Sequence, residues 1–264
     1  MSFMEVCYAH TINERAHQQG HQGCPEQMVT RGAEAPKESY TQLLSLAVHE
    51  LRGPASVVGG YLRMLQRDGD SPLSERHRKM VEEAEKSCAR LVALIAELSD
   101  VSKLDAGLVT MARQPLDAFA LIAEVAELVD AAPDRSVRLE VRGQQDGAYM
   151  SGDAPRLRTA FDAIFRAILR ERAGPCTVVA ERRVETRAGR TSAILVVAED
   201  SSVEAAYDRE PAPFDEERGG MGLALPLARR VIERHGGRIW APAAAETDDA
   251  LARGAALVAL PIEL

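Results

Sequence analysis

The chain contains 264 residues, of which 46% are hydrophobic and 27% are charged. That balance is typical of a folded protein with a packed core and excludes a chain that is disordered throughout. Forty acidic residues outnumber 32 basic ones, and the resulting net charge of −8 excludes a general nucleic-acid-binding protein.

The longest apolar runs fall far short of the roughly 20 residues that a membrane-spanning helix needs. The first residues also lack the apolar stretch of a signal peptide, because Glu5 interrupts them. The cysteines are scattered in the manner of reduced thiols rather than a disulfide framework: Cys7, Cys24, Cys88 and Cys176. We therefore expect a cytoplasmic protein.

Residues 1–36 show neither a helical nor a strand period, and they are rich in Gln, Gly, His and Glu. They predict a flexible tail, too short and too polar for a sensor domain. Five side chains in this tail could bind a metal: Cys7, His10, His17, His21 and Cys24. Only His17 and His21 have the spacing of a structural zinc site, so the sequence favours a tail without metal over a zinc site.

Residues 37–67 and 73–104 predict two long helices joined by a short turn, hence antiparallel neighbours. In both, apolar residues recur at steps of three and four. The two stripes are Leu44, Ala47, Leu51, Pro54, Val58, Tyr61, Leu62 and Leu65, and Met80, Ala84, Cys88, Leu91, Ile95, Leu98 and Val101. A lone hairpin would leave apolar surface in water, so we expect it to form a homodimeric four-helix bundle.

Beyond Gly107 the pattern changes to alternating short strands and helices. Helices are predicted at 118–129, 154–172 and 223–235, and strands at 137–141, 148–151, 177–186, 191–198, 238–240 and 255–263. This alternation predicts a two-layer α/β sandwich. The expected fold class is therefore α+β, with a tail (1–36), a helical hairpin (37–106) and an α/β domain (107–264).

His49 lies on the first helix, away from the apolar stripe. Glu50 adjoins it and could accept a proton from the imidazole as a general base. Pro54 lies in the middle of the same helix, where a proline interrupts the backbone hydrogen bonds and would loosen the helix beside the histidine. A helical histidine is more often an ordinary surface residue, but these two neighbours favour a functional one.

Three segments resemble two-component sensor histidine kinases, in the right order and spacing. Residues 49–54 (HELRGP) are similar to the histidine box of that family, and residues 90–107 to the end of its second dimerisation helix. Residues 219–224 (GGMGLA), followed by 230–240, resemble the glycine-rich G2 box with its trailing helix and strand.

This resemblance implies a phosphoacceptor at His49 on a dimerisation and histidine-phosphotransfer hairpin. It implies a response-regulator receiver domain as partner and an ATP-binding α/β domain with Mg²⁺ as cofactor. Nucleotide phosphates would contact the loop residues Gly219, Gly220, Gly222 and Leu223 together with Arg170. The implied adenine-binding residue is Asp200.

Other positions depart from the family pattern. Both asparagine positions of the Mg²⁺-binding N-box are alanine, Ala163 and Ala167, and a methyl group cannot coordinate a cation that needs oxygen ligands. Asp162 is one residue away, about 100° around the helix. Ser202 and Glu204 occupy two glycine positions of the G1 box. Phe214, by contrast, stands where the family's F-box phenylalanine would be.

These departures make ATP and Mg²⁺ uncertain cofactors and leave three functions open. The chain is a histidine kinase that still uses ATP, a pseudokinase or histidine phosphotransferase that relays phosphate between receivers, or a non-catalytic regulator that forms heterodimers. Gly53 also lacks the side chain with which the family positions a water for receiver dephosphorylation.

Overall fold

The computed structural model describes residues 35–67, 73–129, 136–187, 189–245 and 250–263, and the side chains from position 44 onward. Residues 1–34 of the predicted tail, with the candidate zinc ligands, lie outside the described residues. Ala35 and Pro36, which were predicted as the end of the tail, belong to the first helix.

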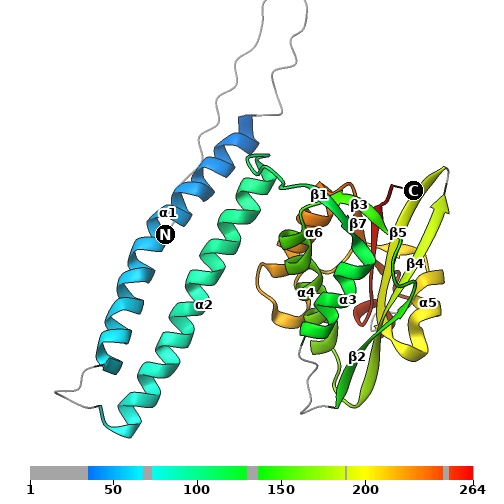
Figure 1. Cartoon of the computed structure of the whole chain (residues 1–264). Helices are drawn as coiled ribbons and strands as arrows, with labels where there is room; N and C mark the ends of the chain where they lie inside the picture. The colour runs from blue at the N-terminus through cyan, green and yellow to red at the C-terminus, as the bar shows by residue number, and fades with distance from the viewer. Residues whose placement is uncertain (1–34, 68–72, 130–135, 188, 246–249, 264) are drawn as a thin grey trace, which may run out of the picture.

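Two long helices, α1 (Ala35–Arg67) and α2 (Glu75–Asp105), form the predicted antiparallel hairpin (Figure 1). Helix α2 begins after Ser74, whose hydroxyl accepts a hydrogen bond from the His77 amide. The helices meet at small residues, since the Cys88 thiol donates to the Ala55 carbonyl at 3.2 Å and lies against Gly59. Gln66 Nε2 donates to Glu85 at 2.7 Å near the turn.

The stripe predicted for α1 is not the surface that packs on α2. Its members Leu51, Val58, Tyr61 and Leu65 are exposed in the single chain, whereas Val48, next to the stripe, is buried. Val48 follows the stripe residue Ala47 by one position and lies about 100° around the helix from it. The face of α1 that packs on α2 is therefore next to the predicted stripe and not the stripe itself. An uncovered apolar face thus runs along the hairpin.

The α/β domain contains a six-stranded sheet and a two-stranded one. In the larger sheet the order is β2 (Val137–Gly143), β4 (Cys176–Arg187), β5 (Arg190–Glu199), β8 (Ala256–Pro261), β7 (Arg238–Pro242), β6 (Pro211–Ala212). Strands β2 and β4 are parallel, and the other neighbours are antiparallel. The smaller sheet pairs β1 (Gln114–Asp117) with β3 (Tyr149–Gly152).

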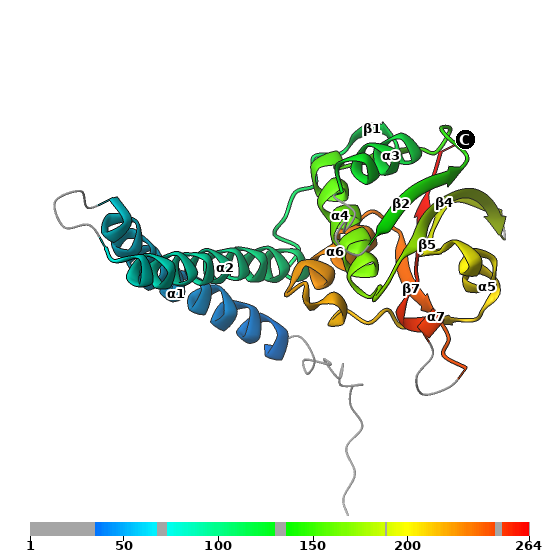
Figure 2. The same cartoon turned by 90° about the horizontal axis from the view of Figure 1, so that it is seen from below.

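One face of the large sheet is covered by α3 (Ala118–Leu128), α4 (Ala154–Arg170) and α6 (Ala224–Arg234) (Figures 1 and 2). The opposite face carries two short helices, α5 (Val203–Asp208) and α7 (Ala250–Arg253). Successive side chains of strand β5 point alternately to these two faces of the sheet. Its side chains enter the main core at Ala193, Leu195 and Val197 and the second core at Ile194, Val196 and Ala198.

The predicted fold class is confirmed: a helical hairpin precedes a mixed α/β sheet domain. The short elements β1, β6, α5 and α7 were not predicted from the sequence. No helix in the described ranges is long and apolar enough to cross a membrane. Helix α6 lies between the sheet and α2, so the hairpin reaches the α/β domain through α6 (Figure 1).

Candidate functional site

The His49 side chain projects from α1 into solvent, with 83% of its surface exposed. Its Nδ1 lies 3.2 Å from Oε1 of Glu50, which is also exposed. Within the described residues, Nε2 has no hydrogen-bonding partner. An imidazole that donates its Nδ1 proton to a carboxylate presents a lone pair on Nε2, as a nucleophile requires.

Pro54 lies one turn beyond His49, and α1 continues through it to Arg67. Because proline has no N–H, the carbonyl of Glu50 loses its usual helical donor. The Ser56 hydroxyl donates to the Arg52 carbonyl at 2.8 Å in the same stretch. The residues after His49 are therefore held by fewer backbone hydrogen bonds than a regular helix provides.

The α/β domain meets α2 near the level of His49. Cys88 of α2 lies against Ala55 and Gly59 of α1. The two helices are antiparallel and rise by the same distance per residue, so positions about 94–98 of α2 lie opposite His49 of α1. Leu94 and Glu97 of this stretch contact the glycine-rich loop at residues 219–222. The predicted phosphate loop and the predicted phosphoacceptor thus lie at the same level along the hairpin axis.

The loop has the backbone conformation that its glycines predict. Gly219, Gly220 and Gly222 all adopt positive φ, between 58° and 68°. A Cβ on Gly219 would lie 3.1 Å from the Cα of Ala167, so the loop packs directly on helix α4. Ala167, at one of the N-box positions, is completely buried beneath it.

Two amide groups of this segment already bind carboxylates of the chain itself. The Gly219 amide donates to Glu171 at 3.0 Å, and the Leu223 amide at the start of α6 donates to Glu97 at 3.2 Å. Arg170 donates to the Gly219 carbonyl at 3.2 Å. The amides and the guanidinium that the resemblance assigns to phosphates therefore contact protein groups.

The N-box helix offers no ligand for a cation at its two alanines. Ala163 and Ala167 are buried in the main core, and Asp162 forms an ion pair with Arg166 at 2.9 Å. Across the described residues, no group of three or more His, Cys, Asp or Glu side chains is placed to hold a metal ion.

Asp200 lies apart from the glycine loop. Its carboxylate accepts a hydrogen bond from Arg142, a contact that raises the pKa of that guanidinium. Arg142 alternates along β2 with Leu139 and Val141, which face the main core, so it lies on the opposite face of the sheet. Glu204 turns to that same opposite face, where it pairs with Arg183. The structure does not bring Asp200 and the glycine loop together.

Phe214 and Arg218 fill the space beside the loop. The Arg218 guanidinium stacks on the Phe214 ring, with Cζ 4.4 Å from the ring centroid. It is buried, which lowers its pKa, and it donates to the carbonyls of Arg253 and Ala255 at 2.8 and 3.0 Å. Sequence reasoning missed Arg218, Glu97 and Glu171, since each is one charged residue among many and only the contacts reveal its role.

ATP with Mg²⁺ does not fit this arrangement. The amides of Gly219 and Leu223 are occupied, oxygen ligands are absent at the two N-box alanines, and Asp200 pairs with Arg142 on the opposite face of the sheet. A nucleotide would have to displace Glu97 and Glu171 and bring phosphate charge beside these two carboxylates.

Comparison with known proteins identifies the hairpin. Residues 39–107 match the His Kinase A (phospho-acceptor) domain. The sensor protein GacS of Pseudomonas syringae pv. syringae is 26% identical over 212 residues, which cover 75% of this chain and 23% of GacS. The probable sensor histidine kinase TcrY of Mycobacterium tuberculosis is 28% identical over 218 residues, covering 78% of this chain and 44% of TcrY. The chain spans less than half the length of these curated relatives.

Solved structures share the fold. Full-length ShkA in complex with AMPPNP superposes with a TM-score of 0.60 at 18% identity, covering 84% of this chain and 46% of ShkA. The histidine kinase ThkA in complex with the response regulator protein TrrA gives a TM-score of 0.51 at 16% identity, covering 87% of this chain and 65% of ThkA. The phospho-acceptor domain and the sensor-kinase relatives support the two-component sensor histidine kinase family for this chain, and the solved structures share its fold.

Proposed function

We propose that the protein acts in two-component signal transduction by exchanging a phosphoryl group between His49 and the aspartate of a response-regulator receiver domain. The observation that carries this proposal is the exposed imidazole of His49 with Glu50 at its Nδ1. A receiver domain could reach this ring without any rearrangement of the hairpin. The ThkA complex with a response regulator supports a receiver as the partner.

In the proposed reaction, the lone pair of Nε2 attacks the phosphorus of an aspartyl phosphate. The new N–P bond forms as the P–O bond to the aspartate breaks, and the aspartate leaves as a carboxylate. The ring becomes an imidazolium whose Nδ1 proton is stabilised by the Glu50 carboxylate. Transfer to a second receiver reverses these steps.

A second candidate is autophosphorylation from ATP. The three glycines of the loop favour it, and so does ShkA, which was solved with the nucleotide analogue AMPPNP. The occupied loop amides and the buried alanines of α4 favour the receiver as phosphoryl source instead. We therefore place transfer without ATP first.

We further propose that two chains pair through their hairpins in a four-helix bundle, with the division between hairpin and α/β domain near residues 106 and 107. The exposed apolar residues along one side of the hairpin support this: Leu51, Val58, Tyr61, Leu65, Met80 and Leu91. Burying such a stripe against its own copy removes apolar area from water.

The test compares two phosphoryl donors on the full chain. In one arm the chain receives γ-labelled ATP with Mg²⁺; in the other it receives receiver domains labelled with acetyl [³²P]phosphate. We expect label on the chain from a receiver and none from ATP. The His49→Gln variant should lose the label, whereas the control His77→Gln, an exposed histidine of α2, should keep it.

Label from ATP at His49 would establish the second candidate. No label from either donor would overturn phosphotransfer at His49 and favour a non-catalytic regulator that forms heterodimers.

A further inference from the structure

We infer that the glycine-rich loop and the start of α6 form a joint that fixes the α/β domain on α2, rather than a nucleotide-phosphate site. The inference goes beyond phosphotransfer at His49 and does not depend on it. It rests on three sets of contacts between α6 or its loop and one face of α2.

The loop itself supplies the first contacts. Glu97 accepts from the Leu223 amide at 3.2 Å, so a side chain of α2 caps the N-terminus of α6. Gly222 lies so near α2 that a Cβ on it would come within 2.9 Å of Leu94 Cδ2. Arg90 Nη2 lies 3.4 Å from the Gly220 carbonyl, which accepts its hydrogen bond. Positions 90, 94 and 97 share one helical face.

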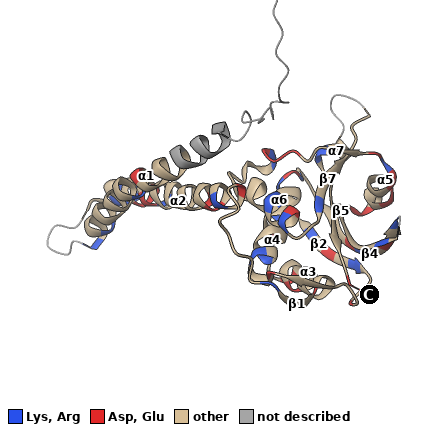
Figure 3. Cartoon of the chain, turned by 90° about the horizontal axis from the view of Figure 1, so that it is seen from above, with Lys and Arg blue, Asp and Glu red and all other residues tan. Residues whose placement is uncertain are grey.

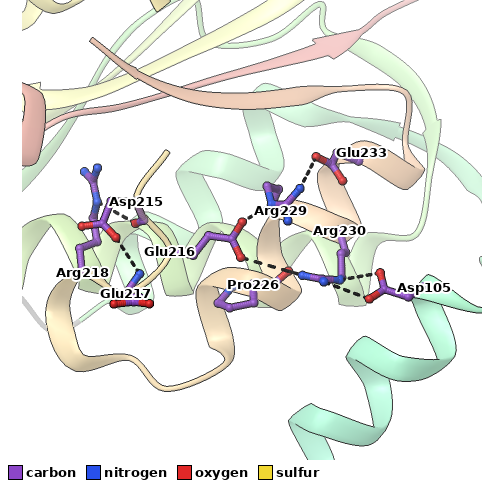
Figure 4. Close-up of polar contacts among 9 residues, drawn as sticks. All are labelled: Asp105, Asp215, Glu216, Glu217, Arg218, Pro226, Arg229, Arg230 and Glu233. Carbon is purple, nitrogen blue, oxygen red and sulfur yellow. Dashed lines mark hydrogen bonds and ion pairs between the residues drawn. The ribbon is translucent and has the colours of Figure 1, made fainter. Parts of the chain in front are cut away.

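An ion pair supplies the second contact, about two turns further along α6. Arg230 binds both carboxylate oxygens of Asp105, through Nε at 2.7 Å and Nη2 at 3.0 Å (Figure 4). The Arg230 guanidinium also lies 3.9 Å from Glu216, which pairs with Arg229. Planar two-point pairs of this kind fix direction as well as distance.

The end of α2 supplies the third set. Arg234 donates to the carbonyl of Leu104, and Arg113 donates to the carbonyl of Arg234 at 2.6 Å. Val101, Ser102 and Leu104 are buried, although most of α2 before residue 98 is exposed or half-buried. The contact therefore runs along the last four turns of α2.

The occupied amides distinguish a joint from a phosphate loop. In a phosphate loop the amides at the start of the helix point to a space that an anion can enter. Here the Glu97 carboxylate occupies that position at Leu223, and Glu171 does so at Gly219. A phosphate could reach the Leu223 amide only if the α/β domain left α2, and it could reach the Gly219 amide only if Glu171, at the end of α4 in the same domain, turned away.

The experiment is hydrogen exchange on the full chain, comparing the unmodified protein with Glu97→Ala, with Arg230→Ala and with the double variant. Glu82→Ala is the matched control, since Glu82 is an exposed acidic residue of α2 in a stretch that does not contact α6. Loss of a helix cap by Glu97→Ala should raise exchange at residues 219–225 about fivefold. The double variant should also raise exchange in α2 at residues 94–104 and increase the radius of gyration in solution scattering.

Protection of the strands β4 and β5 should stay unchanged, which shows that the variants fold. Receiver-dependent labelling of His49 should also persist in the double variant, so failure of phosphotransfer and failure of the joint are distinguishable. Unchanged exchange at 219–225 in the double variant would overturn the inference. So would slower exchange of this loop in the unmodified protein when millimolar Mg-ATP is added.

Discussion

The chemistry of His49 depends on which ring nitrogen holds the proton. Glu50 lies at Nδ1, so the neutral imidazole keeps its proton there and presents Nε2 to a partner. Both side chains are exposed, so this hydrogen bond itself contributes little to folding. In the proposed phosphotransfer, where the ring becomes positively charged, this contact would stabilise the charge.

The first prediction concerns Glu50. Glu50→Gln keeps the size of the side chain but removes its charge, so transfer from a phosphorylated receiver to His49 should slow by roughly 10²-fold. Rapid-quench measurements of a single turnover would give the rate, with Glu82→Gln as the control. An unchanged rate would show that Glu50 takes no part in the transfer.

The second prediction concerns the dependence of folding stability on pH, which we expect to depend on the buried histidine His235. His235 is buried, its Nε2 accepts from the Asp153 amide at 2.9 Å, and its Nδ1 donates to the Val231 carbonyl at 2.7 Å. Burial lowers the pKa of His235 below its ordinary value of 6.5, and nearby Arg113 lowers it further, while the Val231 hydrogen bond and Asp153 oppose the shift. The folded state therefore favours the neutral ring.

The unfolded chain binds this proton at a higher pH than the folded one, so stability should fall as the pH drops from 6.5 towards the lowered pKa. His235→Gln should cost about 1–3 kcal/mol at neutral pH and flatten the decline. Urea unfolding of the full chain above and below pH 6.5 would measure both. A decline equally steep in His235→Gln would assign the acid sensitivity to other groups.

Among the elements, the glycine loop shows most clearly what a sequence can and cannot predict. Its three glycines and the helix that follows were predicted, because only glycine adopts positive φ without strain. The partner of the loop was not predicted. Glu97 is more than 120 residues before Leu223, and nothing in its neighbourhood distinguishes it from other acidic residues of α2.

The same contrast holds for the other elements. Long helices and hydrophobic strands follow from periodicity, so α1, α2, α4 and β5 were found with bounds close to the observed ones. Helix α5 was missed because it is only six residues long. Its position on the opposite face of the sheet, which takes Glu204 away from the glycine loop, comes from tertiary packing.

Two neighbouring glycines give a matched prediction for this loop. Gly219→Ala and Gly220→Ala both introduce a Cβ at positive φ, but only the one at position 219 meets Ala167. Both should lower the free energy of unfolding by about 1 kcal/mol, and Gly219→Ala by about a further 1–2 kcal/mol. Equal losses in thermal or urea unfolding would mean that the loop does not pack on α4.

At the scale of the whole molecule, the hairpin has an exposed apolar face and, separately, a face of α2 that contacts the α/β domain. Charged residues of both signs are interspersed along the hairpin and around α6 (Figure 3). In the proposed dimer, the exposed apolar residues of the hairpin would contact the partner chain. Helix α2 would then have two roles, one towards α6 and one towards a second copy.

The fourth prediction tests this pairing. Tyr61→Glu places a charge in the proposed dimer core, in both copies, and should weaken dimerisation about 10²-fold or more. Leu128→Glu is the control, because Leu128 is 77% exposed on α3, away from the hairpin. Sedimentation equilibrium of the full chain would give the dissociation constants. Equal constants for the two variants would exclude this face as the dimer interface.

The central claim, that His49 takes a phosphoryl group from a receiver, is tested most directly by phosphorus NMR of the full chain. After incubation with a phosphorylated receiver domain, the spectrum should contain the signal of a phosphohistidine substituted at Nε2, and His49→Gln should lack it. Mg-ATP alone should produce no such signal. A phosphohistidine signal from Mg-ATP alone, or none from any receiver, would contradict the account.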